Sequence, residues 1–109
     1  MQNKIELNDI ELEKVTGGVN ENDISDVKEL ISQLINVLSS INEPSEAFLA
    51  INYFNDTIKY LDQNRLDNAK KSFEDGISYV NSLSFAFGDI FAANNFSDTI
   101  TGIRVTMNW

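Results

Sequence analysis

Apolar residues after position 22 recur every three or four positions, which is the pattern of an amphipathic helix. A linker of Val19 to Asn22 precedes this series, and either Asp23 or Asn22 is placed to cap the helix. The residue before proline resists helical angles, so Asn42-Glu43-Pro44 closes the segment. The pattern therefore predicts a first long helix, whose apolar face consists of Ile24, Val27, Leu30, Ile31, Leu34, Ile35, Val37, Leu38 and Ile41.

Two further series predict a second and a third helix. The second series ends near Asp62-Gln63-Asn64 and contains Ala47, Ile51, Phe54, Ile58 and Leu61. The third starts around Arg65, can be ended by Gly88, and contains Leu66, Ala69, Phe73, Ile77, Val80, Leu83 or Ser84, and Phe87. Because such short connections make neighbouring helices antiparallel, residues 19–109 are expected to form an all-α antiparallel bundle of about three helices.

The last stretch of the chain differs from the preceding helical pattern. Residues 85–96 gather Phe85, Phe87, Ile90, Phe91 and Phe96, and the following TITGIRVTMNW alternates in a way that predicts a short strand. Two interpretations of the phenylalanines are open. The favoured one places them in the core, with Trp109 anchoring the tail; the other makes the segment a membrane-active or target-binding surface.

Residues 53–76 resemble a single tetratricopeptide repeat. The resemblance lies in the spacing of Tyr53, Tyr60, Asn64, Leu66, Ala69, Phe73 and Gly76. Asp56 and Thr57 depart from it, because leucine and glycine are usual at those positions. At least three repeats are normally needed for a stable array, so the resemblance implies an antiparallel hairpin with tetratricopeptide-like packing rather than a peptide receptor.

The first eighteen residues carry their own signals for a short helix. Asn8 and Glu11 have the spacing of a capping box, and Leu7 and Leu12 stand at the two positions of a hydrophobic staple. Val15 shares one arc of this helix with the two leucines. A helix this short is marginal in water, so it is expected to form mainly when its apolar stripe meets a partner. Two glycines, Gly17 and Gly18, then end it.

These residues resemble the double-glycine leader peptides of bacterial secreted peptides, which are cut by peptidase-containing ABC transporters. Counted back from a cut after Gly18, the anchors of the pattern are Gly18, Gly17, Val15, Leu12, Glu11 and Leu7. Asn8 stands where serine or threonine is commoner, a mild change because all three residues cap helices. The resemblance covers residues 1–18 only.

The resemblance implies that this chain is a substrate of the papain-like cysteine peptidase domain of such a transporter. Leu7, Leu12 and Val15 would fill an apolar groove of the peptidase, Glu11 would meet a polar or basic group, and the glycines would thread a narrow cleft. The cut would separate a leader, residues 1–18, from a helical cargo, residues 19–109, at the Gly18-Val19 bond. The product would be made in the bacterial cytoplasm and secreted, with a bacteriocin-like or signalling role.

The amino-acid composition excludes several kinds of activity and partner. The chain has no cysteine and no histidine, so the usual nucleophilic dyads and most zinc sites are excluded, and no enzyme activity, cofactor or metal is expected. A net charge of −9 argues against nucleic acid and anionic lipid as partners. No apolar run is long enough to span a membrane, so the chain is expected to encounter a membrane only through the transporter. The acidic groups Glu74-Asp75 and Asp62 with Asp67 are interpreted as solvated helix faces.

An alternative of a different class treats the two glycines as an ordinary linker. In that case the chain is an intracellular acidic helical module with tetratricopeptide-like packing, which engages another protein through its acidic surface or aromatic segment. The alternative predicts that the N-terminus stays intact in the cell.

Overall fold

A computed structural model describes residues 20–41 and 45–109 of the chain. These residues form four helices: α2 (Glu21–Ser39), α3 (Ser45–Asp62), α4 (Leu66–Ala93) and α5 (Phe96–Met107). No strand occurs in the two described ranges. The fold class predicted from the sequence, an all-α bundle, is therefore confirmed, with four helices in place of about three.

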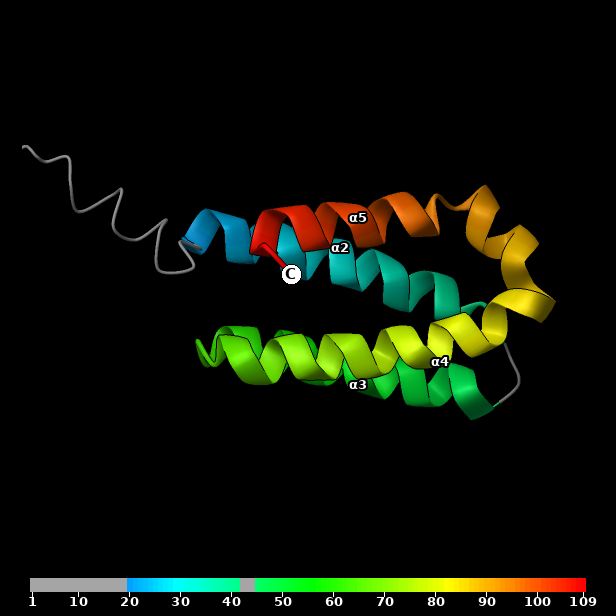
Figure 1. Ribbon diagram of the computed structural model, residues 1–109, viewed down its shortest axis with the longest axis horizontal. Helices are drawn as coiled ribbons and strands as arrows, with labels where there is room; N and C mark the ends of the chain where they lie inside the picture. The colour runs from blue at the N-terminus through cyan, green and yellow to red at the C-terminus, as the bar shows by residue number, and fades with distance from the viewer. Residues whose placement is uncertain (1–19, 42–44) are drawn as a thin grey trace, which may run out of the picture.

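The helices form an elongated bundle in which α2 and α5 lie side by side over the α3–α4 hairpin (Figure 1). The chain runs up and down the long axis of the bundle (Figure 1). Helix α3 packs most extensively against α4, while α2 packs against both α3 and α5. The direct interface between α4 and α5 is much smaller.

The apolar faces predicted for the first three helices are the faces that build the core. Each of these helices presents its apolar series to the others, because a stripe repeating every 3.6 residues can be buried only by rotating it towards the bundle axis. The fully buried core side chains of α2, α3 and α4 include Val27, Ile31, Leu34, Leu38, Phe54, Leu61, Ala69 and Phe73. Helix α5 adds Phe96, Ile103 and Met107 to the same cluster.

Helix α2 begins two or three residues earlier than the capping prediction placed it. Asn20 is the N-cap, and its side-chain oxygen accepts a 2.8 Å hydrogen bond from the backbone N–H of Asp23. The carboxylate of Asp23 accepts in turn from the backbone N–H of Asn20, at 3.4 Å, which completes a capping box. Asn22 and Asp23 lie inside the helix, so the prediction that one of them is the cap is wrong.

The turn between α3 and α4 is built on Asn64, which adopts a left-handed conformation with φ of 58°. The backbone N–H of Arg65 donates to the Tyr60 carbonyl at 2.9 Å, and that of Asn64 donates to the Leu61 carbonyl at 3.0 Å. This pair of bonds is the Schellman arrangement, which asparagine tolerates better than most residues other than glycine. The turn reverses the chain where the sequence pattern placed the boundary.

Helix α4 does not end at Gly88, as the glycine had suggested. The backbone leaves helical geometry at Phe87, with φ of −122° and ψ of 18°, and then resumes as a helix to Ala93. Phe91, in the resumed segment, is buried in the core, and this burial stabilises the extra turns. The kink directs the end of α4 away from α3 and across to the layer of α2 and α5 (Figure 1).

The predicted C-terminal strand is wrong, because residues 96–107 form α5. The buried side chains are Phe96, Ile103 and Met107, with Ile100 partly buried, and their spacing of four, three and four is helical. Val105, which continues the two-residue alternation after Ile103, is instead 75% exposed. Packing against α2 thus overrides the strand preference of the β-branched residues in this segment.

Candidate functional site

The predicted leader site lies outside the described residues. This applies to the cleavage-site residues Gly17, Gly18 and Val19 and to the peptidase-recognition residues Leu7, Glu11, Leu12 and Val15. The described chain starts at Asn20, which is the cap of α2. An ion pair, an aromatic cluster and a pocket lie at the α4–α5 junction.

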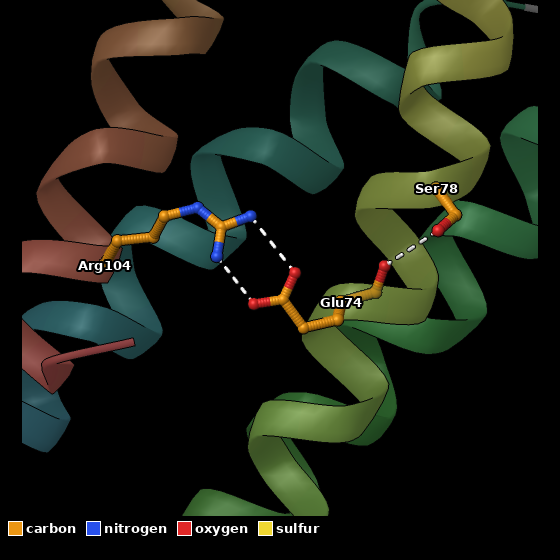
Figure 2. A network of polar contacts seen from close by, with 3 residues as sticks. All are labelled: Glu74, Ser78 and Arg104. Carbon is orange, nitrogen blue, oxygen red and sulfur yellow. Dashed lines mark hydrogen bonds and ion pairs between the residues drawn. The ribbon is translucent and has the colours of Figure 1, made fainter.

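An ion pair joins α4 to α5 across their narrow interface (Figure 2). The guanidinium of Arg104 donates from both terminal nitrogens to the two carboxylate oxygens of Glu74, at 2.6 and 3.1 Å. The hydrogen bond with Glu74 raises the pKa of Arg104 above its usual value, against a smaller opposing effect of burial. This bidentate geometry fixes the orientation of α5 relative to α4 more closely than a single contact would.

Two aromatic rings, those of Phe73 and Trp109, pack next to Arg104 at the same junction. The guanidinium carbon of Arg104 lies 5.3 Å from the centre of the Phe73 ring, and the Trp109 ring packs on Phe73 with 5.2 Å between centroids. The backbone N–H of Trp109 donates to the Arg104 carbonyl at 2.9 Å. The expectation that Trp109 anchors the tail is therefore confirmed.

Beyond this pair, towards the kinked end of α4, residues of the two helices line a pocket of about 380 Å³. Its apolar wall includes Val80, Phe91, Phe96 and Ile100. Its polar wall is formed by Asn81, Ser84, Asn95, Ser97 and Asp98. Gly88 also lines the pocket, and a Cβ atom at this residue would meet nothing within 4 Å. The space at Gly88 is therefore not filled by other residues of the described chain.

The phenylalanine-rich segment divides between core and surface. Phe91 and Phe96 are buried and stack at 4.5 Å between centroids, as the core interpretation predicts, and Phe87 is partly buried. Phe85, by contrast, is 100% exposed, and Ile90 is also exposed. The core interpretation is thus confirmed for Phe91 and Phe96, whereas the proposed membrane-active or target-binding role of the exposed residues stays a prediction.

The acidic groups considered from the sequence lie on helix surfaces, where three of them form ion pairs. Asp62 pairs with Lys28 at 2.6 Å, Asp75 with Lys71 at 3.2 Å, and Glu74 with Arg104. Within residues 20–41 and 45–109, no group of three or more acidic side chains is arranged to hold a metal ion. In the same ranges, no helix has the length and hydropathy needed to cross a membrane.

No protein-family model, curated protein or solved structure matches this chain.

Sequence reasoning missed the pocket and the Glu74–Arg104 pair for different reasons. The pair joins residues thirty positions apart, and no local pattern connects them. The pocket is lined by residues on both sides of the kink at Phe87 together with the start of α5, and the kink was not predicted. The exposure of Phe85 did have a signal, since this residue falls two positions after Leu83 and therefore off the buried stripe of α4.

Proposed function

We propose that this chain is the precursor of a secreted bacterial peptide. Residues 1–18 are the leader, which the papain-like peptidase domain of an ABC transporter recognises and cuts after Gly18, and residues 19–109 are the exported product. One observation carries the proposal: Leu7, Glu11, Leu12 and Val15 stand in the register of a double-glycine leader before Gly17-Gly18. Helix-in-groove recognition of the apolar stripe supplies the physical basis.

The start of the bundle supports this division of the chain. Asn20 and Asp23, the two partners of the capping box, both follow the proposed Gly18-Val19 cut. Cleavage there leaves the cap of α2 intact, together with every core residue from Val27 onwards. The released product is then a four-helix bundle rather than a short linear peptide.

The chemistry of the product favours a role in signalling or partner binding over membrane permeabilisation. Permeabilising peptides attach to anionic lipid through clustered Lys and Arg, whereas residues 19–109 carry 6 such residues against 13 Asp and Glu. A bacteriocin-like activity would therefore act through a protein target. The exported product engages that target with its folded surface.

Cleavage by an isolated peptidase domain tests the proposal. The full chain is incubated with the peptidase domain of a double-glycine transporter, and intact-mass spectrometry is expected to show a product that begins at Val19. Gly18→Ile should abolish this product, because a branched side chain clashes in the glycine cleft. Gly102→Ala is the matched control, since its added Cβ makes only an ordinary 3.5 Å contact with Leu30. Cleavage of Gly18→Ile at the same bond would refute the proposal.

A second candidate, an intracellular interaction module with tetratricopeptide-like packing, is favoured by the α3–α4 hairpin. Small or compact residues are buried where the two helices meet: Thr57, Ala69 and Gly76. The Tyr53 and Tyr79 rings stack across the hairpin at 5.7 Å between centroids. Intact mass in the native bacterium separates the candidates, because only the module predicts a full-length species confined to the cytoplasm.

A further inference from the structure

Charge is unevenly distributed along the long axis of the bundle. The Lys and Arg residues of the described ranges are Lys28, Lys59, Arg65, Lys70, Lys71 and Arg104. They belong to the first half of α2, the C-terminal turns of α3 and α5, and the start of α4, which lie towards the same end of the bundle (Figure 1). Positions 29–58 and 72–103 contain no Lys or Arg at all. The opposite end, with the kink of α4 and the start of α5, therefore carries only acidic charge.

The α4–α5 pocket opens at this acidic end. Asp98 lines the pocket and Asp89 is exposed on the nearby turn of α4. The nearest basic residue in sequence, Arg104, is already paired with Glu74. The two carboxylates thus have no positive charge from positions 72–103 to neutralise them.

A fully exposed aromatic residue, Phe85, is a neighbour along α4 of residues that line the same pocket. Phe85 follows Ser84 and lies one helical turn after Asn81, and both of these residues line the pocket. Phe85 is 100% exposed, whereas Phe91 and Phe96 are buried and form part of the apolar wall. An exposed aromatic ring beside a partly apolar pocket is the arrangement of an interaction hot spot.

We propose that this surface, the pocket with Phe85 and Asp98, binds a basic amphipathic segment of a partner protein. One apolar side chain of the partner enters the pocket, further apolar side chains pack on the Phe85 ring, and Lys or Arg residues face Asp98 and Asp89. The surface lies within residues 80–100. It is therefore present whether or not the chain is cut after Gly18, and the inference goes beyond the proposed processing.

Charge decides against two other occupants of the surface. A second copy of this chain in a symmetric pair, joined through the same surface, would bring two acidic ends together, with no Lys or Arg from positions 72–103 to compensate. An anionic membrane would be repelled for the same reason. A basic partner gains attraction from the same carboxylates, and that attraction also speeds its association.

A designed peptide probe tests the proposal on the full chain. The probe is a fluorescent amphipathic peptide of about 18 residues, long enough to form a helix, with Leu and Phe on one face and Lys on the other. It is expected to bind, and to bind more weakly as ionic strength rises. A peptide with the same apolar face and Glu in place of Lys is expected not to bind.

Three variants locate the binding site on the chain. Phe85→Ala removes the exposed ring, Gly88→Leu fills the pocket from a position with free space, and Asp98→Asn removes the charge. The first two should each weaken binding of the Lys probe by about tenfold or more, and the third by a smaller factor that vanishes in high salt. Phe48→Ala is the matched control, because Phe48 is 59% exposed on α3 and does not line the pocket.

Circular dichroism of each variant establishes that the helices are intact before binding is compared. Equal binding of the Lys and Glu probes would overturn the proposal, as would unchanged binding of the Lys probe by either Phe85→Ala or Gly88→Leu. Self-association of the chain that depends on Phe85, measured by analytical ultracentrifugation, would assign the surface to a second copy. Phe85-dependent binding to vesicles of anionic phospholipid would assign it to a membrane.

Discussion

The ring of Phe54 on α3 occupies the space that a side chain at Gly76 on α4 would need. A Cβ atom built on Gly76 would lie 2.7 Å from Cε1 of Phe54, closer than such atoms approach in proteins. Both residues are buried, so neither can move towards solvent. This contact sets how closely the two helices of the hairpin approach each other.

Gly76→Ala is therefore expected to destabilise the bundle. The added methyl group forces the Phe54 ring or the helices apart, at a cost of about 1–3 kcal/mol that outweighs the gain in helix propensity. Urea unfolding monitored by circular dichroism measures the change in the free energy of unfolding. In contrast, Gly102→Ala should be neutral or stabilising by up to about 1 kcal/mol, because its Cβ makes an ordinary contact with Leu30. Equal effects of the two substitutions would contradict this account of the hairpin.

The capping box of α2 gives a second prediction. Asn20→Ala removes the acceptor for the Asp23 N–H and is expected to lower the free energy of unfolding by about 1 kcal/mol. Asn22→Ala, in the first turn of the same helix, should change it by less than about 0.5 kcal/mol. Thermal unfolding of the two variants makes the comparison. If Asn22→Ala proved the more damaging, the helix would start where the sequence pattern first placed its cap.

The Glu74–Arg104 pair is expected to add a small amount to the free energy of unfolding, and this contribution should come from electrostatic attraction between the two side chains. Both side chains are partly exposed, so solvent screens the pair, and a coupling energy of up to about 1 kcal/mol is expected in a double-mutant cycle of Glu74→Gln and Arg104→Met. The coupling should decrease with added salt. The more exposed Lys71–Asp75 pair, four residues apart on α4, provides the comparison and should show a smaller coupling. A coupling that salt leaves unchanged would mean that the contact is not mainly electrostatic.

Helix α5 can be distinguished from the strand that its alternation suggested by two substitutions. Ile103→Ala empties a fully buried site and is expected to cost about 2–4 kcal/mol. Val105→Ala changes a residue that is 75% exposed, and it should alter the free energy of unfolding by less than about 0.5 kcal/mol. In a strand, residues two positions apart share a face, so comparable losses at the two sites would contradict the helix. Chemical denaturation of both variants provides the measurement.

The helices that the sequence predicted well are those whose apolar residues keep one period over many turns. The series from Ile24 to Ile41 leaves a single face that can be buried, and every member of it is buried or partly buried in the bundle. Local chemistry was also informative at the α3–α4 turn, where Asn64 takes the left-handed conformation that ends a helix. Capping by Asn20 was missed because several neighbouring residues can cap a helix equally well.

The candidate leader site rests on the sequence alone, since its residues lie outside the described ranges. The pocket, by contrast, could not be predicted from any local pattern. It depends on the change of direction at Phe87 and on the placement of the start of α5 against the end of α4. The direction of α4 after Phe87 and the placement of α5 are both set by contacts between residues that are distant in the chain.

By itself, the sequence determined the all-α fold, the buried faces of three helices and the acidic character of the surface. These properties follow from the period of apolar positions and from the count of charged residues, both of which are local or additive. Only the tertiary structure decided that residues 96–107 form a helix, that α4 continues past Gly88, and that Phe85 is exposed beside a pocket. In these short apolar stretches the sequence pattern fits a helix and a strand almost equally well. The helix forms because it buries Phe91, Phe96 and Ile103 in the shared core.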